Sequence, residues 1–77
     1  MKQFELDVMG GNVSKIDIIN DNRVRVYLAR IPSAPSYYFN IGGLSAFETA
    51  LDNLQNELDI SAENRVAVKY RTEVNML

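Results

Sequence analysis

Apolar residues recur with a helical period in the second half of the chain, at spacings of four, three and four positions, which is one face of an α-helix. They are Phe47, Leu51, Leu54 and Leu58. Ser45 followed by Glu48 has the spacing of a capping box, in which the serine caps the helix N-terminus and the glutamate reaches back to the cap. We therefore predict a helix that is capped by Ser45 and runs to Leu58. Its polar side comprises Asp52, Asn53, Gln55, Asn56 and Glu57.

A second, shorter helix is predicted at the start of the chain. Phe4 and Val8 are four positions apart within residues 2–9, so they lie on one helical face. Gly10 and Gly11 follow directly, and glycine commonly ends a helix because it adopts the left-handed conformation at little cost.

Four segments have the alternation of β-strands, in which every second side chain faces the same way. These segments are residues 13–19, 23–28, 37–41 and 65–70. The triplet Asn20-Asp21-Asn22 separates the first two and favours a tight turn, because Asn and Asp tolerate positive φ. The first two strands are therefore expected to form an antiparallel hairpin.

The order α-β-β-β-α-β predicts an α+β fold, a small two-layer sandwich with a mostly antiparallel sheet and helices on one face. The last strand is expected beside an earlier one. We treat residues 1–77 as one domain and expect residues 71–77, from Arg71 on, to be a frayed tail. The predicted core comprises Ile16, Ile18, Val24, Val26, Leu28, Phe39, Ile41, Phe47, Leu51, Leu54, Leu58, Val66 and Val68.

Composition narrows the chemistry open to this chain. With 77 residues, net charge −2 and a pI near 4.9, the chain lacks the basic character that nucleic-acid binding requires, so we expect no nucleic-acid partner. There is no histidine and no cysteine, which removes the commonest general acid–base and the usual zinc ligands. We therefore expect no catalytic, cofactor-binding or metal-binding residue in this chain.

The remaining polar patterns have structural interpretations. Nothing in the spacing of the ten acidic residues forces two carboxylates together around a scissile bond, so they are assigned to a solvated surface. Asp17 is expected to form a surface ion pair with Arg23 or Arg25 across the hairpin, worth less than about 1 kcal/mol. Gly42-Gly43 is interpreted as a turn, because the Lys-Ser/Thr pair of a phosphate-binding loop is absent.

Two apolar or aromatic residues are candidates for contact with a partner or substrate. Ile31 lies in the proline-containing connection of residues 29–36 and would be exposed unless it docks. Tyr38 faces away from the apolar side of its strand, and tyrosine is favoured at interfaces because it combines area with a polar tip.

The segment from Tyr37 to Tyr70 resembles the membrane-external domain of FtsH-family AAA proteases, in particular the AFG3-like and paraplegin group of mitochondrial m-AAA protease subunits. The resemblance consists of an aromatic strand with an Ile-Gly turn, the helix with spaced Phe and Leu, and a Glu-Asn-Arg-Val stretch that leads into a strand. The matching residues of that last part are Leu58, Ile60, Glu63, Asn64, Arg65, Val66 and Tyr70. Asp59 departs from the glycine common at its position, and Ala67 from a proline.

This resemblance implies that the chain is a fragment of a hexameric, ATP-dependent zinc metalloprotease of the mitochondrial inner membrane. The fragment would lie in the intermembrane space between transmembrane helices absent here, and the ATP and zinc sites would lie outside this sequence. The implied role is a noncatalytic accessory domain that contacts membrane-protein substrates or other protease subunits. The alternative role is a structural spacer that promotes hexamer assembly.

Overall fold

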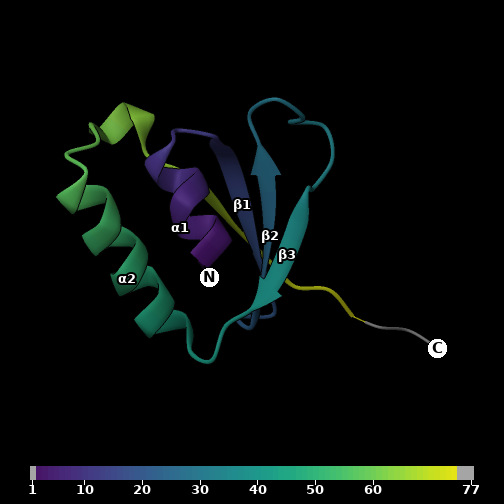
Figure 1. Cartoon of the computed structure of the whole chain (residues 1–77). Helices are drawn as coiled ribbons and strands as arrows, with labels where there is room; N and C mark the ends of the chain where they lie inside the picture. The colour runs from purple at the N-terminus through teal and green to yellow at the C-terminus, as the bar shows by residue number, and fades with distance from the viewer. Residues whose placement is uncertain (1, 75–77) are drawn as a thin grey trace.

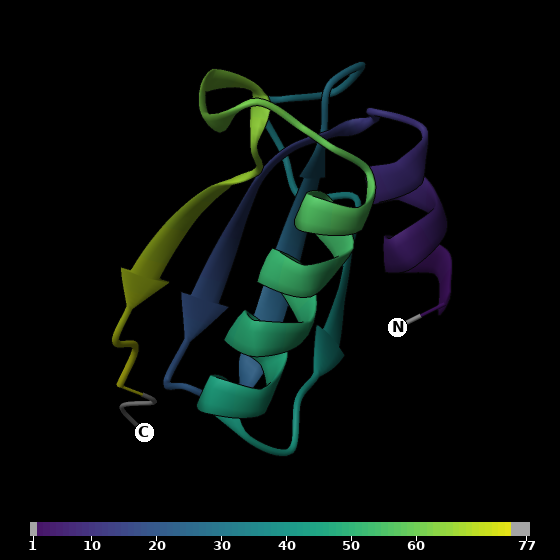
Figure 2. The same ribbon diagram turned by 90° about the vertical axis from the view of Figure 1, so that its left-hand side faces the viewer.

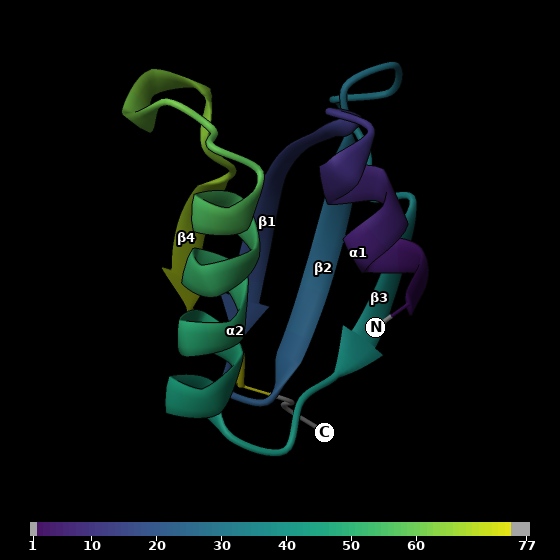
Figure 3. The same ribbon diagram turned by 60° about the vertical axis from the view of Figure 1, so that its left-hand side comes forward.

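The computed structural model describes residues 2–74 and contains the six predicted elements in the predicted order (Figure 1). They are α1 (Lys2–Met9), β1 (Val13–Ile19), β2 (Arg23–Leu28), β3 (Tyr37–Asn40), α2 (Leu44–Glu57) and β4 (Ala67–Arg71), with a 3₁₀ turn at Ala62–Asn64 before β4. The two helices lie side by side over one face of the sheet and leave the other face without a helix (Figures 2 and 3). The predicted α+β two-layer fold is confirmed.

The sheet has the strand order β3-β2-β1-β4. β1 pairs antiparallel with β2, β2 pairs antiparallel with β3, and β4 adds to the free side of β1 in parallel. The predicted hairpin turn is present, since Asn20 and Asp21 both adopt positive φ, at 52° and 60°. The chain then crosses from the β3 edge to the β4 edge through α2, which places the last strand beside the first.

The core lies between the sheet and both helices. Seven predicted core residues are buried: Ile16, Ile18, Val24, Val26, Leu28, Phe47 and Leu51. Five more are half-buried and pack against them: Phe39, Ile41, Leu54, Leu58 and Val66. Phe4 and Val8 of α1 also belong to the core, although the predicted core omitted them. Phe4 packs between Phe39 and Phe47, with ring centroids 5.4 and 6.0 Å away, so one aromatic cluster joins α1, β3 and α2.

The core prediction is wrong at one position, Val68. Val68 is 38% exposed, and every residue of β4 is exposed. The reason is the position of β4 at the edge of the sheet, where only one neighbouring strand covers it. Alternation correctly predicts which face Val68 occupies, but not how completely that face is covered.

The predicted capping box at the start of α2 is also wrong. The helix begins at Leu44, and its N-cap is Gly43, which is extended and makes no side-chain cap. Ser45 therefore lies inside the first turn instead of at the cap. Glu48 is used elsewhere, as its carboxylate accepts a hydrogen bond from the hydroxyl of Tyr70 on β4. That bond is the main cause of the raised pKa of Tyr70, with burial and nearby carboxylates adding to it.

The helical period assigns Gln55 to the polar side of α2, but its side chain is only 3% exposed. Its Oε1 accepts a hydrogen bond from the backbone amide of Val66 at 2.8 Å. The connection that returns from α2 to β4 folds back over this residue, so a side chain on the polar side of the helix becomes internal.

α1 is tied to the sheet by a polar contact as well as by its apolar face. The hydroxyl of Tyr37 on β3 donates to Asp7 Oδ2 at 2.6 Å, and Gln3 Nε2 donates to Asp7 Oδ1 at 3.2 Å. Burial and this contact with Asp7 raise the pKa of Tyr37 well above its usual value. An isolated helix of this length would be only marginally stable, so α1 depends on its apolar face and on this polar contact with β3.

Two residues of the predicted frayed tail, Arg71 and Glu73, make hydrogen bonds with the hairpin. Arg71 is the last residue of β4 and pairs with Ile19. Beyond it, Glu73 exchanges hydrogen bonds with Asn20, from backbone amide to Oδ1 and from Nδ2 to the backbone carbonyl, each at 2.9 Å. Residues 75–77 of the predicted tail lie outside the described residues.

Candidate contact site

The two predicted contact residues are both exposed, but they occupy different parts of the molecule. Ile31 is 49% exposed and lies just after β2, where its backbone amide donates to the carbonyl of Leu28 at 3.0 Å. Tyr38 is 65% exposed and lies on β3, opposite Arg25 of β2. Tyr38 therefore belongs to the sheet, and Ile31 belongs to the connection at its end.

Tyr38 is part of a larger polar and aromatic surface, which we call the open face. It consists of the strand side chains that point away from the helices. Its members are Lys15, Asp17, Ile19, Arg23, Arg25, Tyr27, Tyr38, Asn40, Ala67, Lys69 and Arg71. Two cations lie over aromatic rings: Lys15 Nζ is 4.4 Å from the centre of the Tyr27 ring, and the Arg23 guanidinium is 5.4 Å from that of Tyr38.

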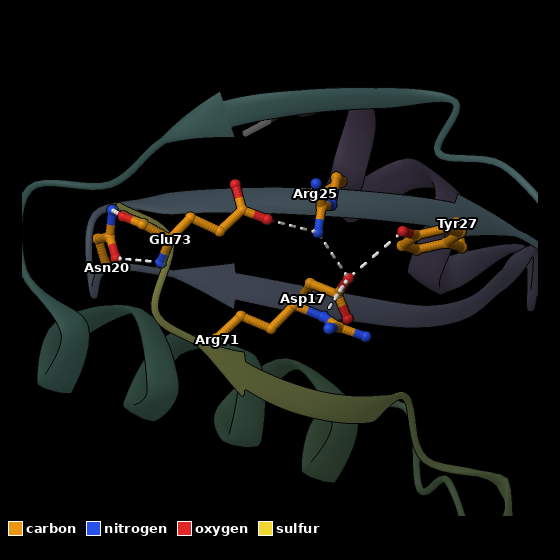
Figure 4. A network of polar contacts seen from close by, with 6 residues as sticks. All are labelled: Asp17, Asn20, Arg25, Tyr27, Arg71 and Glu73. Atoms are coloured by element: carbon orange, nitrogen blue, oxygen red, sulfur yellow. Dashed lines mark hydrogen bonds and ion pairs between the residues drawn. The ribbon is translucent and has the colours of Figure 1, made fainter. Parts of the chain in front are cut away.

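Asp17 lies at the centre of the open face and is wholly inaccessible to solvent. Its Oδ2 atom accepts three hydrogen bonds, from Arg25 Nη2 at 3.2 Å, Tyr27 OH at 3.3 Å and Arg71 Nε at 3.1 Å. Figure 4 shows these side chains pointing toward the carboxylate from β2 and β4, which flank β1. Glu73 extends the network, with its Oε2 atom 3.4 Å from Arg25 Nη2.

The predicted ion pair between Asp17 and Arg25 is therefore present, but its predicted surface character is wrong. The long side chains of the neighbouring strands cover the short carboxylate, so the pair is buried on the Asp17 side. Burial alone raises the pKa of Asp17, but the hydrogen bond from Arg25 and the charges of Arg71, Arg25 and Lys15 outweigh it and lower that pKa below its usual value. Asp17 is consequently ionised at neutral pH and donates no proton there.

Two recesses on the helical side have lining residues from both helices or from the connection that follows α2. An open cleft of about 610 Å³ lies between the end of α1 and the connection from α2 to β4, and its lining includes Val8, Leu58 and Ile60. A second recess of about 310 Å³, which we call the helix groove, lies between α1 and α2. Phe4, Phe47, Leu51 and Leu54 give it an apolar lining, and Glu5 and Glu57 are also among its lining residues.

Residues 2–74 contain neither a group of side chains suited to a metal ion nor a helix that could span a membrane. No three His, Cys, Asp or Glu side chains of this range are grouped so that they could hold a metal ion. Neither helix of the described range is long and apolar enough to cross a membrane. The residues present therefore do not fit the zinc ion that the family resemblance implies for the parent protein.

Sequence reasoning selected Tyr38 but missed the residues around it. Arg71 and Lys69 of β4 join Asp17 and Arg25 on one surface only because β4 pairs with β1. Arg23, Arg25 and Tyr27 alternate with Val24, Val26 and Leu28 in the sequence, so a strand places these three on one face. What the alternation could not show is that Asp17 would be covered by them.

The sequence of this chain is similar to segments of known proteins. No family model matches the chain. The chain is 41% identical over 66 residues to the mitochondrial inner membrane m-AAA protease component AFG3L2 of Mus musculus, a match that covers 82% of this chain and 8% of that protein. It is 36% identical over 69 residues to the m-AAA protease component yta12 of Schizosaccharomyces pombe, covering 87% of this chain and 9% of that protein.

The chain is similar to one short segment of m-AAA protease components. A plant relative agrees, since the ATP-dependent zinc metalloprotease FTSH 3, mitochondrial, of Oryza sativa subsp. japonica is 35% identical over 63 residues, covering 75% of this chain and 8% of that protein. These homologues support the family that the sequence resemblance indicated. The chain spans less than a tenth of the length of each of these relatives.

Proposed function

We propose that this chain is a noncatalytic accessory domain of an ATP-dependent zinc metalloprotease component of the mitochondrial inner membrane, and that it lies in the intermembrane space. The observation that carries this proposal is the similarity of more than four fifths of the chain to a segment of m-AAA protease components. The ATP and zinc that such a parent uses would be bound by other parts of it.

Within that parent, the domain contacts polypeptide substrates or other protease subunits through Ile31 and Tyr38. Both side chains are large, apolar or aromatic, and about half exposed or more. Backbone bonds hold the start and end of the connection between them, from Ile31 to Leu28 and from Ser36 to Val26 at 2.8 Å. Tyr38 lies on a paired strand, and a contact residue whose backbone is already fixed loses less conformational entropy on binding.

The second role is to bring copies of the protease component together. The uneven distribution of charge between the open face and the helices favours this role. The first role is tested with an unfolded substrate segment and the second with this chain alone, so the two tests are separate.

The first role is tested by adding an unfolded membrane-protein segment to the isotope-labelled domain and following its amide resonances. We expect shifts clustered on residues 29–38, and we expect Ile31→Ser and Tyr38→Ala each to weaken binding about fivefold or more, as for residues that contribute more than about 1 kcal/mol. Leu6→Ser is the matched control, because Leu6 is 52% exposed on α1, away from this region. Unchanged spectra at high segment excess would remove the substrate-contact role.

A further inference from the structure

Charge is separated between the two layers of this molecule. The open face and its attached Glu73 hold five of the chain's eight cationic side chains but only two of its ten carboxylates, which leaves a balance of plus three. The cations are Lys15, Arg23, Arg25, Lys69 and Arg71, and the carboxylates are Asp17 and Glu73.

The helices and the connection to β4 have the opposite sign. Residues 2–9 and 44–66 carry seven carboxylates and two cations, a balance of minus five. The carboxylates are Glu5, Asp7, Glu48, Asp52, Glu57, Asp59 and Glu63, and the cations are Lys2 and Arg65. A net charge of −2 therefore conceals a basic side and an acidic side on opposite layers of the fold, and such surfaces attract one another between molecules.

The acidic side contains a recess of suitable chemistry for a basic and aromatic side chain. The helix groove, of about 310 Å³, has Phe4, Phe47 and Leu51 at its base, each no more than 7% exposed. Glu5 and Glu57, both exposed, also line it. An apolar base with carboxylates beside it fits a ligand that carries an aromatic ring and a cation together.

The basic side presents that combination at Arg23 and Tyr38. Both are exposed, and the guanidinium lies 5.4 Å from the ring centre, so the two side chains stand together. Arg25 and Arg71 are bound to Asp17. Of the open-face cations that make no ion pair within the described residues, Arg23 is the one that lies over the ring of Tyr38. Tyrosine and arginine are also the residue types that most often dominate protein–protein contacts.

We propose that the helix groove of one copy of this chain binds the Arg23 and Tyr38 side chains on the open face of another copy. The contact is head-to-tail, because the two surfaces lie on opposite layers of each molecule, and a repeated head-to-tail contact closes into a ring when the rotation between copies permits. This inference deepens the second role proposed above, on which it rests, and identifies the surfaces that perform it.

The test begins with amide spectra of the chain over a range of concentrations at low ionic strength, about 0.01 M, and high ionic strength, about 1 M. We expect concentration-dependent shifts at low ionic strength on two patches, one around Arg23 and Tyr38 and one around the helix groove. At high ionic strength the shifts diminish, because salt screens the attraction between exposed charges.

Two charge reversals then test the pairing of the surfaces. Arg23→Glu on the open face and Glu57→Lys in the groove should each weaken self-association about tenfold or more. An equimolar mixture of the two variants should recover association, since each retains the surface that the other lacks. The matched controls are Arg30→Glu and Glu63→Lys, which reverse exposed charges outside the helix groove and away from Arg23 and Tyr38. Each should weaken association much less than the paired reversals, although Glu63 belongs to the acidic layer.

Each contrary outcome has a distinct meaning. No concentration-dependent shift at low ionic strength overturns this inference and removes the assembly role with it, while shifts on adding the unfolded segment would still support the substrate-contact role. If Arg23→Glu weakens association but Glu57→Lys does not, two open faces meet each other and the groove is not the partner surface. If the four variants behave alike, the attraction is nonspecific and the proposed pairing is wrong.

Discussion

Asp59 shows how one residue ends the main helix of this protein. The backbone amide of Asp59 donates to the carbonyl of Asn56, and that of Ile60 donates to the carbonyl of Gln55, which is the hydrogen-bond pattern of a Schellman motif. The motif requires a left-handed residue, and Asp59 has a φ of 55°. Glycine is the usual residue there because it has no Cβ to clash with the following carbonyl.

We expect Asp59→Gly to stabilise the chain. Relief of the left-handed strain is partly offset by the greater freedom that glycine has in the unfolded state, which leaves a gain of about 0.5–1 kcal/mol in the free energy of unfolding. Urea denaturation of the two proteins measures this difference. Asp59→Ala is the control, because alanine removes the same carboxylate but keeps a Cβ, and a gain of equal size there would show that charge, not backbone conformation, is responsible.

The departure of Asp59 from glycine was visible in the sequence, but the start of α2 was not. A single residue decided the start, because an extended Gly43 serves as the N-cap and shifts the helix so that Ser45 falls inside the first turn. The capping-box spacing of Ser45 and Glu48 describes what these residues can do locally. Tyr70, distant in sequence, offered Glu48 a different hydrogen bond.

At the scale of elements, Gln55 joins α2 to the connection that leads into β4. Its side-chain Oε1 atom accepts a hydrogen bond from the backbone amide of Val66. Arg65 stabilises the same connection by donating to Asn56 Oδ1 at 2.7 Å and to the backbone carbonyl of Ile60 at 3.2 Å. These bonds join residues that are 11, 9 and 5 positions apart and fix the connection that precedes β4. A helical period assigns Gln55 to the polar side, so periodicity alone could not find this role.

The substitution Gln55→Met tests the hydrogen bond between the Gln55 side chain and the Val66 amide. The substitution keeps an unbranched side chain of similar length but leaves the Val66 amide without its acceptor, which we expect to lower the free energy of unfolding by about 1–2 kcal/mol. Hydrogen exchange at the Val66 amide should accelerate relative to amides of β2. Gln55→Glu retains an oxygen acceptor at the same position, so it should preserve the slow exchange; if both variants exchange alike, the side-chain bond does not protect this amide.

At the scale of the whole molecule, Asp17 connects strands that are far apart in sequence. It receives hydrogen bonds from β2, eight and ten positions away, and from β4, 54 positions away. Removing one partner of a buried ion pair leaves the others without compensation, which is far more costly than losing a surface pair. Asp17 therefore stabilises the assembled sheet and not the hairpin alone.

We expect Asp17→Asn to lower the free energy of unfolding by about 2–3 kcal/mol. Asp21→Asn is the matched control, because Asp21 is an exposed carboxylate in the neighbouring turn and asparagine also tolerates its positive φ of 60°. That control should change stability by less than about 0.5 kcal/mol. Equal losses in the two variants would contradict a special role for the buried network.

The same network gives stability a defined pH dependence. The pKa of Asp17 is lowered in the folded chain, so its contribution is complete above the unfolded-state value of about 3.9 and is lost as the pH falls through the folded-state value. The free energy of unfolding of the native chain should therefore decline below about pH 4. Asp17→Asn should show a shallower decline in this window, measured by urea denaturation at each pH, and an identical slope would mean that other carboxylates cause it.

The sequence by itself determined the elements, their order, the faces of the strands and most of the core, because those properties follow from local periodicity and turn chemistry. It also indicated the m-AAA family through a segment of the chain, and homologous segments support that family. Ile31 and Tyr38 are solvent-exposed, and their contact role stays a prediction.

Only the tertiary structure decided which polar residues became internal and how the charges were distributed. Asp17 and Gln55 are buried because β4 and the connection before it return over positions that local patterns assign to solvent. The basic open face and the acidic helical layer likewise arise when strands distant in sequence pair and both helices cover the same side. Pairing between remote segments depends on the packing of the whole chain, and a local pattern carries no information about which remote segment will cover it.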